Sequence, residues 1–184
     1  EAIEIAEKVT HLCTDKTGTL TAGNPEVVSR VTADGITERD LLQIAASLEA
    51  QSEHPLARAI VEFARTEDIA LRDAADFQST TGGGVSANVD GRRVLVGKQK
   101  FLADSGVSIS EKLRREAERL QEQAQTTVWV ALKGHPVGVL GIADPIKPTT
   151  GAAVRALHDM GLKIIMCTGD NRRTAESVAR ELGI

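Results

Sequence analysis

Two short, mainly apolar runs, one near each end of the chain, lead into small polar loops that contain an aspartate. The first run covers residues 9–13 and precedes Thr14-Asp15. The second covers residues 162–167 and precedes Thr168-Gly169-Asp170. Runs of this length and composition are typical of buried β-strands. The sequence therefore predicts two strands, each of which ends at a loop that carries a carboxylate.

Apolar residues at helical spacing flank the second run on both sides. Helices are predicted at residues 148–160 and 171–182, and Gly161 and Gly183 supply their C-terminal signals. The expected buried face of the first helix consists of Ala152, Ala153, Ala156, Leu157 and Met160. A succession of helix, buried strand and helix is typical of a parallel α/β sheet, in which strands end at a shared edge. We therefore expect the two aspartate loops to lie side by side.

The stretch between these halves has an α+β pattern of its own. Helical spacing begins after Thr37 and again at Pro55, a residue favoured at the first helical position. Alternating residues surround Asp90-Gly91 and Lys133-Gly134-His135, which are turn sequences of β-hairpins. The pattern Ser108-x-x-Glu111 predicts the capping box of a further helix. The predicted fold class is thus α/β: a partial, Rossmann-like domain at residues 1–22 and 144–184, interrupted at residues 23–143 by an inserted α+β domain with an antiparallel sheet.

Composition and charge exclude several classes of protein. The formal net charge is −4, from 22 Lys and Arg against 26 Asp and Glu, and 41% of the residues are hydrophobic, which is typical of a globular chain. With no basic excess and 2% aromatic residues, binding to nucleic acid is not expected. No apolar run approaches the ~20 residues of a membrane helix, so we expect the chain itself to be soluble. Cys13 and Cys167 end apolar runs and are expected as reduced thiols in the core.

The segment Asp15-Lys16-Thr17-Gly18-Thr19-Leu20-Thr21 carries the strongest chemical signal. It places a carboxylate at the end of a predicted strand, beside a cation, in a loop of small hydrogen-bonding residues. An aspartate that attacks a phosphoryl group needs such an ionised carboxylate, together with exposed backbone N–H groups and room for a phosphate. An ordinary strand-to-loop turn explains any one of these positions, but not all seven together.

All seven positions resemble the phosphorylation motif of P-type ATPases, the cation pumps built on a haloacid-dehalogenase-like phosphorylation domain. The resemblance implies that Asp15 accepts the γ-phosphoryl group of ATP, and that the Asp15 carboxylate and the Thr17 carbonyl help to hold Mg²⁺. It implies catalytic roles for Lys16 and for Thr168, Gly169 and Asp170, which resemble the phosphate-contacting Thr-Gly-Asp of the family. Asp144-Pro145-Ile146-Lys147 resembles the hinge at which the inserted domain rejoins the phosphorylation domain, although a plain proline turn also explains it.

Thr17 favours a pump over a phosphatase. Phosphatases of the same superfamily carry a second aspartate two residues after the nucleophile, where it acts as the general acid and base. A threonine cannot activate water effectively at this position, so the aspartyl phosphate is expected to persist. A haloacid-dehalogenase-type phosphatase remains one alternative function, and a non-catalytic nucleotide-binding module remains another.

The inserted domain resembles that of the heavy-metal-transporting branch of these pumps, through Ser52-Glu53-His54-Pro55. At the N-cap of the helix that begins at Pro55, the His54 ring is placed to stack on adenine. The other nucleotide-binding residues that the resemblance implies are Glu49, Gly82, Gly84, Val85 and Gly97. Lys98 stands where the family has an asparagine, and a lysine there is able to reach a phosphate instead.

The resemblance also implies partners that this sequence does not contain. They are the membrane helices and actuator domain of a full-length pump, the remaining Mg²⁺ ligand, and the transported metal ion. We expect this ion to be copper, with zinc, silver and cadmium as the alternatives. We therefore expect the chain to be a fragment from the cytoplasmic side of a membrane protein, with ATP and Mg²⁺ as its cofactors.

Overall fold

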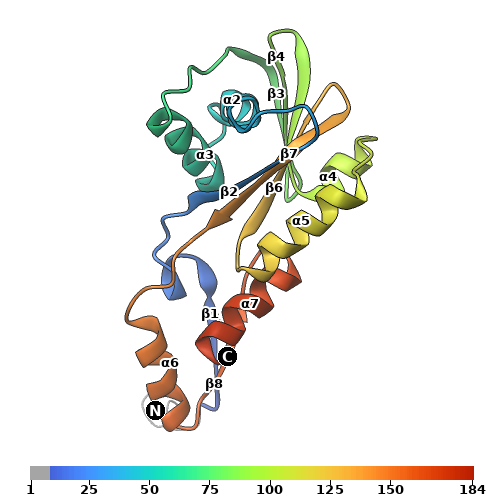
Figure 1. Ribbon diagram of the computed structural model, residues 1–184. Coiled ribbons are helices and arrows are strands. Elements are labelled where there is room, and N and C mark those ends of the chain that lie inside the picture. The colour runs from blue at the N-terminus through green and yellow to red at the C-terminus, as the bar shows by residue number, and fades with distance from the viewer. Residues whose placement is uncertain (1–8) are drawn as a thin grey trace. The chain divides into compact units, whose positions relative to one another are not determined.

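The computed structural model describes residues 9–184, so the first eight residues of the segment expected at 1–22 lie outside the described part (Figure 1). The chain divides into two units. The first contains the described residues up to Asn24 together with Asp144–Ile184, and the second is Pro25–Ala143. The second unit is thus inserted, in sequence, between the two parts of the first.

The two aspartate loops of the first unit follow adjacent strands. Strand β1 (His11–Asp15) pairs with β8 (Lys163–Cys167) in a parallel two-stranded sheet, with Asp15 opposite Cys167. The expected parallel pairing is therefore confirmed. The first strand begins two residues later than the pattern predicts and includes Asp15 as its last residue.

Two helices complete the first unit, α6 (Thr150–Asp159) and α7 (Arg172–Leu182), and α6 packs against β8 and α7. The expected buried face of the first helix is wrong. Thr150 and Val154 are its buried residues, whereas Met160 is 75% exposed. Cys13 and Cys167 are also exposed rather than in the core. Within residues 9–184 this unit has only two strands, so its helices and strand faces have little apolar surface to pack against.

The second unit is built on a six-stranded antiparallel sheet, whose strands follow the order β2-β7-β6-β5-β4-β3. The strands are β2 (Glu26–Thr32), β3 (Ala74–Thr80), β4 (Gly84–Val89), β5 (Arg92–Gly97), β6 (Thr126–Leu132) and β7 (His135–Ala143). The two predicted hairpins are present. Their two-residue turns have positive φ angles, 49° and 69° at Asp90-Gly91 and 51° and 79° at Lys133-Gly134, as type I′ turns require.

Helices cover both faces of this sheet (Figure 1). Helices α2 (Glu38–Glu49) and α3 (Pro55–Thr66) pack on one face, around a core that includes Leu41, Ile60 and Val94. Helices α4 (Gln99–Asp104) and α5 (Glu111–Glu122) pack on the other face, around Trp129 and Leu120. Within residues 9–184, no helix has both the length and the apolar character needed to cross a membrane.

Most helix starts in this unit follow from local capping. Thr37 caps α2 by accepting a hydrogen bond from the Asp40 N–H at 3.0 Å. The predicted capping box at Ser108 is wrong, because Ser110 caps α5 by accepting from the Leu113 N–H at 3.3 Å. Val107 and Ile109 are both buried in the core beneath α4 and α5, so the chain stays extended through Ser108 and the helix begins later.

Candidate functional site

Asp15 and Thr168-Gly169-Asp170 come together because their strands pair in parallel. Asp15 ends β1 directly opposite Cys167, which ends β8 and precedes Thr168. The Lys16 ammonium forms an ion pair with Asp170, and these side chains are only 8% and 13% exposed. The Asp170 N–H also donates to Thr168 Oγ1 at 3.1 Å. Lys16 therefore connects the loop after β1 to the loop after β8, rather than serving Asp15 alone.

The segment after Asp15 is an irregular turn, η1 (Lys16–Leu20). Thr17 has ψ = 123° and Gly18 has φ = 75°, both outside the helical region, and glycine adopts the second angle without strain. Thr17, Gly18 and Thr19 are exposed. The turn thus leaves backbone groups accessible next to the Asp15 carboxylate, as a phosphate-binding loop requires.

The segment at which the chain re-enters the first unit holds this turn in place. Asp144 Oδ2 accepts a hydrogen bond from Thr21 Oγ1 at 2.5 Å, and its Oδ1 accepts from the Gly23 and Asn24 N–H groups at 2.9 and 3.1 Å. Lys147 Nζ donates to the Gly18 carbonyl at 2.5 Å, and Thr150 Oγ1 donates to the Leu20 carbonyl at 2.7 Å. Residues 144–150 therefore position the loop that follows Asp15.

Sequence reasoning missed these contacts of Asp144, Lys147 and Thr150, because they join positions more than a hundred residues apart. A carboxylate and a lysine at the point of return from an insertion are the only local signal. Its role can be recognised only when the segment before the insertion and the segment after it are known to lie side by side.

In the second unit, Glu49 is a buried carboxyl group at the end of α2. The side chain is 7% exposed, and its Oε2 has no hydrogen-bond partner among residues 9–184. Burial raises the pKa of Glu49 to about 7, and a hydrogen bond with Ser52 opposes the rise only in part. An unsatisfied buried acceptor is costly, so Glu49 is well suited to receive a hydrogen-bond donor from a ligand.

Glu49 should make the stability of the chain depend on pH. Because its pKa rises from an ordinary 4.5 to about 7 on folding, the folded state binds more protons between these values and loses stability as the pH rises through them. A Glu49→Gln variant carries no titrating group at this position and should not lose this stability. Between pH 4.5 and 8, the unfolding free energy of the wild type should therefore fall relative to that of the variant by up to about 3 kcal/mol. Urea unfolding across this range measures the shift. The exposed Glu53→Gln is the control, and an E49Q difference that does not change with pH would contradict the assignment.

His54 is the N-cap of α3, which begins at Pro55 as predicted. Its Nδ1 accepts a hydrogen bond from the Leu56 N–H at 3.2 Å, so the neutral ring carries its proton on Nε2. The side chain is exposed. The ring is thus oriented by the helix cap, and its faces and Nε2–H remain open to a ligand.

The glycines that are expected to bind the nucleotide differ in the structural reason for having no side chain. Gly84 lies opposite Gly97 in the β4–β5 pair, and a Cβ on Gly97 would lie 2.5 Å from the Gly84 Cα. A Cβ on Gly84 would lie 2.4 Å from the Val96 carbonyl oxygen. Close strand approach therefore explains both glycines. Gly82, in contrast, has φ = 70° and open space around it, so its surroundings do not require glycine for packing.

The other two residues expected in this loop face in different directions. Val85 is 8% exposed and belongs to the core beneath α2 and α3, so only its backbone is available to a ligand. Lys98 is exposed, and its N–H donates to the Gly83 carbonyl at 2.9 Å. The structure thus brings Gly82–Val85 and Gly97-Lys98 together, while Glu49 and His54 form a second group at the α2–α3 junction of the same unit.

Residues 9–184 match the family of haloacid dehalogenase-like hydrolases. The chain belongs to this family. Copper-transporting ATPase 1 of Rhizobium meliloti (strain 1021) is 45% identical to it over 184 residues, which is 100% of this chain and 22% of that protein. The chain therefore spans about a fifth of the length of this curated relative.

Two solved structures are similar to the chain over its whole length. A zinc-transporting PIB-type ATPase in the E2.Pi state matches with a TM-score of 0.70 and 34% identity, covering 100% of this chain and 29% of that one. The catalytic domain of the CPx-ATPase CopB-B matches with a TM-score of 0.71 and 26% identity, covering 100% of this chain and 62% of that one. This haloacid dehalogenase-like chain is thus homologous to the catalytic portion of heavy-metal P-type ATPases.

Proposed function

We propose that the chain is the nucleotide-binding and phosphoryl-accepting portion of an ATP-driven heavy-metal cation pump. The observation that supports this most is the pairing of β1 with β8, which sets Asp15 beside the loop of Thr168 and Asp170. A nucleophilic carboxylate at a strand end, an open backbone turn next to it and a second polar loop alongside provide what phosphoryl transfer needs. Homology to the catalytic portion of such pumps supports the same conclusion.

In the proposed reaction, an Asp15 carboxylate oxygen attacks the γ-phosphorus of ATP. A new O–P bond forms, the bond from the γ-phosphorus to the β–γ bridging oxygen breaks, and ADP leaves with the electron pair. The open turn at Thr17–Thr19 and the Thr168 hydroxyl offer donors for the phosphoryl oxygens. Lys16 and Asp170, as an ion pair, keep the two loops at a fixed separation.

The residues near Asp15 fit Mg²⁺ in part. The Asp15 carboxylate and the Thr17 carbonyl are hard oxygen donors of the kind that this ion prefers. Residues 9–184 contain no group of three or more His, Cys, Asp or Glu side chains able to hold a metal alone. We therefore propose Asp15 and Thr17 as two of its ligands. When bound there, the ion neutralises charge on the phosphoryl oxygens.

We propose that the second unit binds the ATP. His54 would stack on the adenine, Glu49 would accept a hydrogen bond from the adenine amino group, and the backbone of Gly82, Gly84, Val85 and Gly97 would line the nucleotide. Lys98, exposed and without an ion pair among residues 9–184, would contact a phosphate. The similarity to a CPx-ATPase catalytic domain whose conformational changes upon nucleotide binding are known supports this role.

Replacing His54 by Ala should weaken ATP binding by about tenfold, because stacking on adenine contributes on the order of 1.4 kcal/mol. Since His54 also caps α3, His54→Asn is the decisive companion. Asparagine keeps a capping acceptor but removes the ring, so it should restore the stability of the helix without restoring affinity. Titration calorimetry and urea unfolding of both variants measure the two effects. If His54→Asn binds ATP with the affinity of the wild type, stacking of the His54 ring on adenine does not contribute to binding.

A phosphatase of the same family is the second candidate, favoured by the match to hydrolases. The residue two positions after Asp15 is Thr17, which is not a general base. An aspartyl phosphate at Asp15 would therefore be long-lived, which suits a pump cycle better than hydrolysis. Hydrolysis of an aryl phosphate by this chain would favour the phosphatase instead.

The transported ion and the location of the chain are proposed from the relatives. Copper is named for the Rhizobium meliloti relative and zinc for a solved structure, and we propose copper because its relative has the higher identity. We further propose that the chain lies on the cytoplasmic side of the membrane, joined to the membrane and actuator domains of the same protein.

A further inference from the structure

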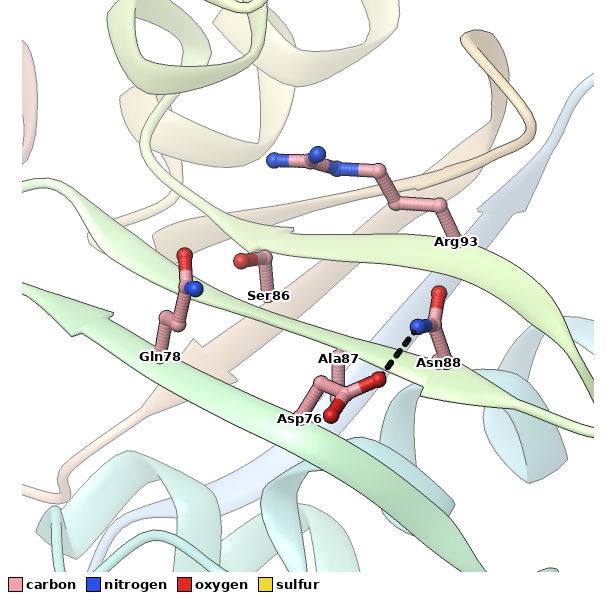
Figure 2. A pocket seen from close by; sticks show the side chains of 6 residues that line it. All are labelled: Asp76, Gln78, Ser86, Ala87, Asn88 and Arg93. Carbon is pink, nitrogen blue, oxygen red and sulfur yellow. Dashed lines mark hydrogen bonds between the residues drawn. The ribbon is translucent and has the colours of Figure 1, made fainter.

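A polar hollow of about 140 Å³ lies on the sheet of the second unit (Figure 2). Its lining comes from β3, β4 and β5, and consists of Asp76, Gln78, Ser86, Ala87, Asn88 and Arg93. Its volume far exceeds the ~10–15 Å³ that admit a single water molecule. The hollow contains none of the residues assigned to phosphoryl transfer or to ATP.

Strand alternation places the polar side chains of β4 that line the hollow, Ser86 and Asn88, on the face opposite α2 and α3. Val85, Ala87 and Val89 of β4 belong to the core beneath those two helices, so Ser86 and Asn88 point the other way. In the sheet Gln78 lies opposite Ser86, and Asn88 lies opposite Arg93. On this second face α4 and α5 pack on β2, β5, β6 and β7. The hollow thus occupies the part of the face beside the helices.

Among the polar side chains that line the hollow, Asp76 and Asn88 are hydrogen-bonded to each other, whereas Arg93, Ser86 and Gln78 have no such partner within residues 9–184. Asp76 Oδ2 accepts a hydrogen bond from Asn88 Nδ2 at 2.8 Å, and Figure 2 shows these two side chains meeting at one end. Arg93 forms no ion pair with any residue in the range 9–184, although Asp76 lines the same hollow. Its neighbour Arg92, in contrast, pairs with Asp90 at 3.7 Å.

Two further hydrogen-bond donors, on Ser86 and Gln78, line the hollow without a partner in the described part of the chain. Ser86 is only 8% exposed, and within the described chain neither its hydroxyl nor the Gln78 side-chain amide makes a hydrogen bond to protein. A guanidinium, a hydroxyl and an amide with no protein acceptor together form a set of donors around one space. Such a set matches the oxygens of an oxyanion, and the guanidinium makes those hydrogen bonds charge-assisted.

We propose that this hollow binds a small oxyanion, the carboxylate or phosphate group of a ligand, through Arg93, Ser86 and Gln78. The Asp76 carboxylate stands at the other end and repels extended polyanions, so a single anionic group is favoured over a triphosphate. This site shares no residue with the proposed ATP site, although Ser86 directly follows Val85 in β4.

The test is a titration of the whole chain with inorganic phosphate and, separately, with acetate, followed by NMR. Chloride at equal ionic strength serves as the reference. The amide signals of Gln78, Ser86 and Asn88 and the Arg93 Nε–H signal should shift together and saturate. Shifts with both ions identify a general carboxylate and phosphate site, and shifts with one ion identify which group it selects.

Three variants make the result specific. Arg93→Gln should lower the affinity about tenfold or more, and Ser86→Ala should lower it by a smaller factor. Arg92→Gln removes the same charge from the adjacent residue, which is already paired, and should leave the affinity within about twofold. The proposal is overturned if these signals do not move, or if Arg92→Gln and Arg93→Gln weaken binding equally, since that would indicate a general effect of charge.

Discussion

Replacing Asp15 by Asn should abolish phosphorylation by ATP of the full-length pump that we propose. Asparagine has nearly the same shape, but its amide has no oxygen that can form a stable acyl phosphate, so the loss should be complete rather than partial. Because Asp15 is the last residue of β1 and is exposed, the substitution should leave the fold unchanged. Acid quenching after addition of γ-labelled ATP measures the phosphorylated protein, and metal-stimulated ATP hydrolysis should fall with it.

Asp159→Asn is the matched control for this variant. Asp159 is exposed at the end of α6 in the same unit, so its replacement makes the same change of charge away from the loop. It should retain wild-type phosphorylation. ATP binding should survive in Asp15→Asn, because the proposed ATP site belongs to the second unit. A pump that still transports metal after Asp15→Asn would favour the non-catalytic nucleotide-binding function.

Replacing Gly97 by Ala should destabilise the second unit by about 3 kcal/mol or more. The new Cβ would lie 2.5 Å from the Gly84 Cα and 2.6 Å from the Gly83 carbonyl oxygen. These are backbone atoms of the paired strand and of the turn before it, so relief requires β4 and β5 to move apart rather than a side chain to rotate. Urea unfolding monitored at Trp129, which is buried in this unit, measures the loss.

Gly151→Ala shows that the effect is not general to glycine. Gly151 lies inside α6, and its nearest neighbour would be the flexible Arg155 Nη1 at 3.6 Å. Alanine there should stabilise the helix by about 0.5–1 kcal/mol. If the Gly97→Ala variant is as stable as the wild type, β4 and β5 can move apart at this point without loss of stability. The close pairing of Gly84 and Gly97 would then not explain why glycine occupies both positions.

Local patterns are sufficient to predict the elements with strong internal signals. The hairpin at Asp90-Gly91 follows from its turn residues, and α3 follows from Pro55, because each depends on neighbours in sequence. The pairing of β1 with β8 follows from the α/β pattern together with two similar strand-to-loop transitions. These same patterns are enough to predict that Asp15 and Thr168 lie at one edge of the sheet.

Long-range packing decides what local patterns do not reveal. Strands β2 and β3 were not predicted, because both are edge strands with many exposed residues and irregular register. The ion pair of Lys16 with Asp170 joins residues 154 positions apart, so no local pattern reports it. For Glu49, the resemblance indicated a ligand contact, but only its burial at the end of α2 explains a pKa of about 7.

The central claim is that Asp15 receives the phosphoryl group of ATP, and identification of the phosphorylated residue tests it most directly. The full-length pump is labelled with γ-labelled ATP, reduced with borohydride and digested for mass spectrometry. Borohydride reduces an acyl phosphate but not a free carboxylate, so a phosphorylated aspartate becomes homoserine. We predict homoserine at position 15, absent when ATP is omitted. Label on another residue, or bound ATP with no change at position 15, would contradict the account.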